Sequence, residues 1–268
     1  MRKIHLIRIS LIITGISMTF CACHHKAIST LVSFDKVAID TTVDLVPGDS
    51  ASPKAKINLI YTYAKGDSVK QINNYILSSN AFRNDLVSTY SLENLPPKEV
   101  VSKFVQEYIK EYRKTCGPIY AKDKTTMSCN YEFLSDGEVI NNGKYACLTF
   151  KKYVYTGGAH GISSNITINI DKKNGGIITK DKLLKQISPS KTRQEIVKSL
   201  IKQLNVKNFK QLHDSLYVFS DDSVYIPDNF IIGKDSIIFI YDDLEIAPHY
   251  MGILKAKVAK KDIQIKPE

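Results

Sequence analysis

A glycine-rich segment around one histidine is the first place where this sequence could do chemistry. It follows a strand-like stretch and consists of Tyr155, Thr156, Gly157, Gly158, Ala159, His160 and Gly161. A histidine can act as a general base or bind a metal, and glycines let the backbone bend sharply or approach a ligand. The segment lacks the spacing of a phosphate-binding loop and of a serine nucleophile elbow. It therefore predicts a bent, tightly packed loop and a candidate binding surface, with His160 either structural or functional.

A second segment, residues 241–252, combines carboxylates with a histidine. Its ionisable side chains of interest are Asp242, Asp243, Glu245 and His249. These residue types bind metals, yet no two histidines stand at a ligand spacing. Carboxylates that cap a turn explain the pattern better, so the sequence predicts no metal site and no cofactor. Glu245 and His249 remain candidate ligand-binding residues. A hydrolase-like site would need His160 to meet a carboxylate near Glu245.

Three cysteines lie beyond the N-terminal region: Cys116, Cys129 and Cys147. If Asn141-Asn142-Gly143 forms a hairpin turn, the strand register keeps Cys129 far from Cys147, whereas Cys116 lies in a turn-like Cys-Gly-Pro sequence. We therefore predict a Cys116–Cys129 disulfide and a buried Cys147 thiol. The spacings fit neither a catalytic cysteine nor a metal site.

The N-terminus has the features of a bacterial lipoprotein leader. A basic start is followed by an apolar run, Ile9 to Phe20, which is too short to span a membrane,. Ala22 precedes Cys23 as in a lipobox, although Phe20 replaces the usual leucine. The sequence predicts a signal peptide at residues 1–22, a lipid-modified Cys23 and a tether at 23–30. The protein would then be anchored to a membrane outside the cytoplasm. Because no acidic export signal follows Cys23, we expect it to face the periplasm.

Composition and charge narrow the class of partner. The chain has 268 residues, 43% hydrophobic and 24% charged, which is typical of a globular protein and excludes a wholly disordered one,. Its formal charge is +10. Removal of Arg2, Lys3 and Arg8 with the leader lowers the charge to +7. The remaining lysines are scattered and form no basic stripe, so no nucleic-acid partner is expected.

Hydrophobic periodicity predicts an α+β fold with mostly antiparallel sheets, about three helices and two small subdomains. We expect helices that begin near residue 67 or 68, at Pro97, and at a capping box formed by Thr192 and Glu195. The expected strands cover residues 32–46, 57–64, a hairpin that turns at 141–143, 165–170, 223–232, 236–241 and 252–260.

The order of these motifs resembles a bacterial extracytoplasmic family, the domain of unknown function 3298 found in RsiV and PdaC. The resemblance rests on residues 155–161, a turn at 171–176, Asp228-Asn229-Phe230, and Tyr241 with Glu245-Ile246-Ala247-Pro248. The preceding part is similar to the partner domain of unknown function 4163. The resemblance implies an N-terminal domain at 31–150 and a C-terminal domain at 151–268.

The same resemblance implies a binding module, because RsiV-like members bind lysozyme and PdaC acts on the cell wall. This sequence lacks the sigma-binding region of the one and the deacetylase domain of the other, so neither activity carries over. We expect a lipid-anchored, non-enzymatic envelope protein that binds peptidoglycan or a protein such as lysozyme, with no catalytic residues. A hydrolase-like enzyme and a purely structural lipoprotein remain the alternatives.

Overall fold

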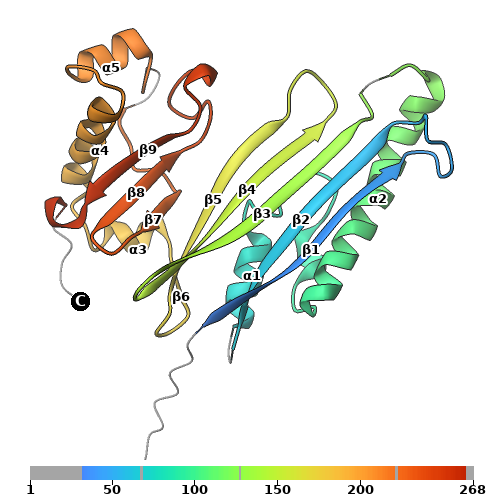
Figure 1. The fold of residues 1–268 in the computed structure, drawn as a ribbon, viewed down its shortest axis with the longest axis horizontal. Helices are drawn as coiled ribbons and strands as arrows, with labels where there is room; N and C mark the ends of the chain where they lie inside the picture. Colours follow the sequence, from blue (N-terminus) through green and yellow to red (C-terminus); the bar gives the residue numbers. More distant parts are fainter. Residues whose placement is uncertain (1–31, 67–68, 127, 221–222, 264–268) are drawn as a thin grey trace, which may run out of the picture.

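The computed structural model describes residues 32–66, 69–126, 128–220 and 223–263. These residues form two β-sheets, each with its own helices, so the predicted α+β class and the two subdomains are confirmed (Figure 1). The predicted signal peptide, Cys23 and the tether lie outside the described residues. Within the described part of the chain, no helix is both long and apolar enough to cross a membrane.

The first sheet has six strands in the order β1-β2-β3-β4-β5-β6. Their bounds are Ser33–Asp44, Lys54–Lys65, Tyr131–Asn142, Tyr145–Thr156, Ile162–Asp171 and Gly176–Ile178. All neighbours pair antiparallel except β2 and β3, which are parallel. The parallel pair follows from the chain path, because α1, η1 and α2 form a crossover between these two strands,.

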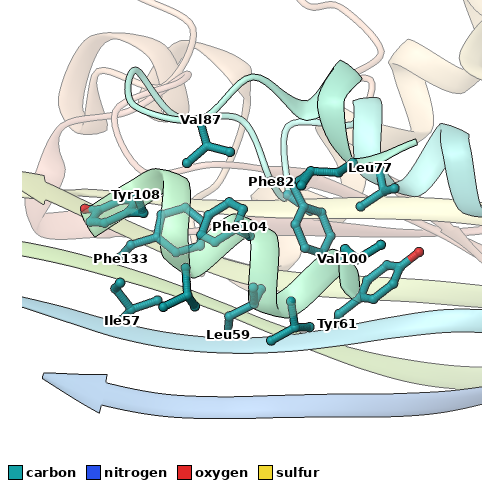
Figure 2. Packing of buried hydrophobic residues seen from close by; sticks show 14 of the residues in the cluster. Ile57, Leu59, Tyr61, Leu77, Phe82, Val87, Val100, Phe104, Tyr108 and Phe133 are labelled. Atoms are coloured by element: carbon teal, nitrogen blue, oxygen red, sulfur yellow. The ribbon is translucent and has the colours of Figure 1, made fainter. Parts of the chain in front are cut away.

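The core of this sheet lies on the face covered by α1 (Lys70–Ser78) and α2 (Pro97–Lys122). Alternate residues of β2 point into it, and α2 contributes a stripe at helical spacing,. Phe104 of α2 packs against Phe133 of β3, with ring centroids 5.0 Å apart (Figure 2). Burial of these aromatic and aliphatic side chains supplies most of the driving force for folding of this subdomain.

The second sheet has the order β7-β8-β9, with strands at Phe230–Ile232, Ser236–Tyr241 and Leu254–Ala259. Three helices accompany it: α3 (Lys180–Leu184), α4 (Pro189–Gln203) and α5 (Phe209–Leu216). Short 3-10 helices, η1 (Thr89–Leu92), η2 (His249–Met251) and η3 (Lys260–Asp262), complete the described elements. Helix α4 packs on β9, and a separate hydrophobic core forms between them.

Side chains join the two sheets edge to edge. The outer edge of β5 faces β7, and the two strands exchange hydrogen bonds through side chains instead of a backbone ladder. The Asn229 carbonyl oxygen Oδ1 accepts from the Thr167 amide at 3.1 Å, and the Thr167 hydroxyl accepts from the Phe230 amide at 2.9 Å. Asn169 accepts from the Ile232 amide and donates to the Phe230 carbonyl. Backbone groups at the two edges therefore have hydrogen-bond partners, although β5 and β7 do not form one continuous sheet.

The helices differ from the prediction in number and in one starting point. The described residues contain five α-helices, whereas about three were expected; the short helix α5 was not expected. The predicted capping box at Thr192 is wrong. Helix α4 begins one turn earlier, because Ser188 caps it, Pro189 suits the first turn, and the Thr192 hydroxyl donates back to the Ser188 carbonyl,.

The strand predicted at 223–232 begins only at Phe230, because residues 223–229 form no strand, whereas the strand predicted at 236–241 is confirmed as β8. The expected domain boundary at 150/151 also needs correction. Strand β4 continues through it to Thr156 and pairs with β3 and β5 on both sides. The first buried cluster ends at Ile170 and the second begins at Leu183, so the boundary falls near residue 179.

The predicted Cys116–Cys129 disulfide is absent from the structure, which holds Cys116, Cys129 and Cys147 as buried free thiols. The two predicted partners are neighbours nonetheless. The Cys129 thiol donates a weak hydrogen bond to the Cys116 carbonyl oxygen at 3.6 Å. Burial raises the pKa of Cys116 and of Cys147 to about 12, which keeps both thiols protonated and slow to react,. The buried Cys147 matches the prediction.

Candidate ligand-binding surface

The glycine-rich segment forms the tip of the β4–β5 hairpin, at the end of the first sheet. Gly157 has φ +83°, and a Cβ atom on it would lie 2.1 Å from the Ser128 carbonyl oxygen. A Cβ on Gly161 would meet the Tyr153 ring at 2.3 Å. Both glycines are therefore required by close approach, as the sequence predicted for a tightly packed loop. Their role is structural.

The remaining residues of this tip face solvent. Tyr155 donates from its hydroxyl to the Gly158 carbonyl at 2.8 Å and so closes the turn. Thr156, Ala159 and His160 are exposed. Among the described residues none forms a hydrogen bond or ion pair with His160, so its ring is available to an external group.

The β8–β9 loop holds its acidic residues in an internal network. Glu245 accepts from the Tyr225 hydroxyl at 2.8 Å through one carboxylate oxygen and from the Asp242 amide at 2.7 Å through the other. Asp242 in turn accepts from the Asn165 amide and side chain, 2.9 and 3.0 Å away. Burial, with Tyr225 and Glu245 nearby, raises the pKa of Tyr241. Asp242 therefore attaches the loop to β5. Glu245 attaches it to Tyr225 and to the backbone of the loop itself.

His249 takes part in a more exposed contact. Its Nδ1 lies 2.5 Å from Asp243 Oδ2, and its side chain is 79% exposed. In the described part of the chain, no three His, Cys, Asp or Glu side chains come together as a metal site. Each carboxylate of this segment contacts protein groups instead.

The same loop exposes large apolar side chains. Leu244 is 69% exposed and Tyr250 is 73% exposed. Leu244 also has φ +64°, and Tyr217, at the end of α5, has φ +56° and is 57% exposed. Bulky residues rarely adopt this left-handed conformation, because it costs about 1–2 kcal/mol per residue. Strained backbone of this kind is often found at functional sites.

A hollow of about 250 Å³ lies between Tyr217 and Leu244. It is lined by Tyr217, Phe219, Ser220, Leu244, Glu245, Ile246, Ala247 and Pro248. The sequence indicated the segment 241–252 but missed residues 217–220, because only their backbone conformation and position beside the loop distinguish them. Neither property leaves a pattern in the sequence, since Tyr217 and Leu244 are not the glycine or asparagine usually found at positive φ.

Both candidate segments lie at the same end of the molecule (Figure 1). The Asn165–Asp242 contact ties the strands that carry them. However, His160 and Glu245 share no hydrogen bond or ion pair, and both oxygens of Glu245 are already occupied. Among the described residues, His160 and Glu245 are therefore not joined in the acid–base pair that the hydrolase-like alternative needs,. The arrangement instead presents groups that a ligand could contact. These are an exposed histidine on the hairpin tip and apolar side chains around the hollow beside the β8–β9 loop.

Two family models match the chain in sequence. Residues 50–163 match the family described as deacetylase PdaC, and residues 177–261 match the protein family of unknown function DUF3298. The second match begins at residue 177, close to the structural boundary near residue 179, whereas the first match ends earlier, at residue 163. The glycine-rich tip thus belongs to the PdaC match, and the β8–β9 loop belongs to the DUF3298 match.

A curated relative and two solved structures are also similar. The anti-sigma-V factor RsiV of Bacillus subtilis (strain 168) is 24% identical over 213 residues, which cover 76% of this chain and 71% of RsiV. A crystal structure of a DUF3298 family member from Bacteroides fragilis NCTC 9343 has a TM-score of 0.75 and 22% identity, covering 87% of this chain and 92% of that one. A DUF3298 family protein from Pseudomonas aeruginosa PAO1 has a TM-score of 0.54 and 13% identity, covering 88% and 95%. Residues 50–163 are therefore similar to the PdaC family, residues 177–261 are similar to DUF3298, and the chain is similar to RsiV over 213 residues.

Proposed function

We propose that the protein is a non-enzymatic, lipid-anchored envelope protein that binds a ligand at the end of the molecule formed by residues 155–161 and 241–252. The ligand is a protein such as lysozyme, or peptidoglycan. The observation that carries this proposal is the exposure of Tyr217 and Leu244, in left-handed backbone conformations, beside a hollow of about 250 Å³.

Energetic reasoning favours binding over a merely structural role. Exposed apolar side chains gain free energy when a partner covers them, about 25 cal/mol per Å² of apolar area removed from water. Aromatic residues such as Tyr217 and Tyr250 are also typical anchors of interfaces, because they bury a large area at low entropic cost. The similarity to RsiV supports a protein ligand, and the similarity to the PdaC family supports peptidoglycan.

Retention on immobilised ligand tests the proposal. The protein is applied to lysozyme-coupled beads and, separately, to insoluble peptidoglycan, and retention on at least one is expected. The double variant Leu244→Ser with Tyr250→Ser should lose most of that retention. Tyr90→Ser is the matched control, because Tyr90 is 83% exposed but belongs to η1 in the other subdomain. Equal retention of all three proteins, or retention of none, would argue against this surface.

The lipid anchor is tested independently in the bacterial cell. We expect labelled palmitate to be incorporated into the full chain and into Cys21→Ala, but not into Cys23→Ala. A thioether-linked diacylglycerol and an N-linked acyl chain on Cys23 would hold the protein stably at a membrane, facing the periplasm. Incorporation into Cys23→Ala would contradict the proposed anchor without affecting the binding surface.

A further inference from the structure

The first sheet ends in an open edge formed by β1. This strand is twelve residues long and is the outermost strand of its sheet (Figure 1). In an antiparallel pair, alternate residues direct their backbone groups away from the neighbouring strand. The Lys36 amide bonds the adjacent Asp35 side chain, and the Asp44 carbonyl accepts from Arg113. Even-numbered residues of β1 therefore present their N–H and C=O groups to the open edge.

Most of these groups have no partner along the described chain. The backbone groups of Phe34, Ala38, Asp40 and Thr42 on this side form no hydrogen bond with any described residue. The odd-numbered face is also incomplete. Val37 and Ile39 pack against the first core but are only partly buried, because no strand lies beyond them. A further strand at this edge would pair with the free backbone groups of β1 and would also cover the exposed part of Val37 and Ile39.

We propose that β1 pairs antiparallel with β1 of a second copy of this chain, with Ala38 on the two-fold axis. The pairing joins two six-stranded sheets into one sheet of twelve strands. In this register Val37 lies opposite Ile39 of the second copy, and the reverse, so the half-buried residues cover each other. About ten backbone hydrogen bonds form, and the Lys36 amide exchanges its bond to Asp35 for one across the interface.

Charge complementarity selects this register. With Ala38 at the centre, Lys36 lies opposite Asp40 of the second copy, and this contact occurs twice. A centre at residue 36 would oppose two lysines, and a centre at residue 40 would oppose two aspartates. Charges on an edge strand usually prevent pairing with other chains. Here their spacing also makes the strand complementary to itself, so a second copy is favoured over an unrelated strand.

Cross-linking in the cell envelope tests the register on the full chain. In a hydrogen-bonded antiparallel pair the two Cα atoms on the axis lie about 5.5 Å apart, which suits a disulfide. Ala38→Cys should therefore give a dimer on a non-reducing gel after mild oxidation with copper phenanthroline. Thr42→Cys is the matched control, because the two copies of residue 42 would lie about 27 Å apart. Both positions are exposed, so folding is preserved.

The charged residues of β1 provide a second test of the proposed register. In the Ala38→Cys background, Lys36→Asp should lower the dimer yield several-fold, and adding Asp40→Lys should restore it. Three results would overturn the proposal. They are a dimer yield from Ala38→Cys no higher than that of the wild type, an equal dimer yield from Thr42→Cys, and a dimer yield that the charge substitutions do not change. None of these results bears on the ligand-binding surface, which lies on residues outside β1.

Discussion

The hairpin tip at residues 155–161 and the β8–β9 loop at 241–252 use their motif residues in opposite ways. In the tip, the glycines are fixed by close approach to Ser128 and Tyr153, while His160 faces solvent without a described partner. In the β8–β9 loop, Asp242 and Glu245 bond protein groups, whereas the apolar Leu244 and Tyr250 face solvent. The comparison teaches that most motif residues build the two loops, and that the residues available to a ligand are a smaller and different set.

The largest expected effect on stability comes from substitution of Gly157, because no space is available for a side chain there. Gly157→Ala would place a Cβ 2.1 Å from the Ser128 carbonyl oxygen at φ +83°. We expect a loss of about 3 kcal/mol or more in the free energy of unfolding, measured with urea. Gly158→Ala is the control, because its φ is +97° but no atom lies within 4 Å of the added Cβ. It should cost about 1–2 kcal/mol. Equal costs would mean that backbone strain alone, and not packing, shapes the tip.

The next effect separates two neighbouring carboxylates of the β8–β9 loop. Asp242→Ala removes the acceptor of the Asn165 amide, and an unsatisfied amide costs about 1–3 kcal/mol,. Asp243→Ala should change the free energy of unfolding by less than about 0.5 kcal/mol, since its partner His249 is largely exposed,. Urea unfolding of both variants decides whether the inward network stabilises the loop. If Asp243→Ala is the more damaging change, the description of this network is wrong.

A smaller effect concerns the hydroxyl that supports Glu245. Tyr225→Phe removes a 2.8 Å hydrogen bond to Oε1 and leaves the ring in place. We expect a loss of about 1.5 kcal/mol, because the acceptor is a carboxylate. Thermal unfolding followed by circular dichroism would record it. No change in the melting temperature would show that water replaces the hydroxyl without cost.

The smallest effect is expected at His160. Because its side chain is exposed and has no described partner, His160→Ala should change the free energy of unfolding by less than about 0.5 kcal/mol,. The informative readout is ligand retention on the beads described above, which should fall if the tip contributes to binding. A marked loss of stability would instead assign His160 a structural role, like that of the glycines.

Regular periodicity made much of the fold predictable. The alternating apolar residues of β2 and the helical stripe after Pro97 lie in the elements expected of them, because each buries one face against the same core,. The hairpin expected at residues 141–143 also forms, but its turn lies at residues 143–144, because β3 continues to Asn142; Gly143 has φ +61°. These elements depend on local sequence and on one buried face.

Features that depend on the meeting of distant segments were not predictable. The alternation of Asn165, Thr167 and Asn169 is typical of a strand with one solvent-facing side, yet these residues bond the edge of a second sheet. Asn229 belongs to a motif whose structural purpose appears only with Thr167 beside it. Likewise, nothing in the types of Tyr217 and Leu244 indicates a left-handed backbone. Tertiary contacts override local preference at these positions.

Amide hydrogen exchange in the presence and absence of ligand tests the binding surface most directly. The protein is compared alone, with excess lysozyme, and with excess soluble peptidoglycan fragments. The account predicts that at least one ligand slows exchange in residues 155–161, 217–220 and 241–252, while the helices on the first core are unchanged. It would be contradicted if neither ligand slowed exchange, or if protection appeared only on α1 and α2.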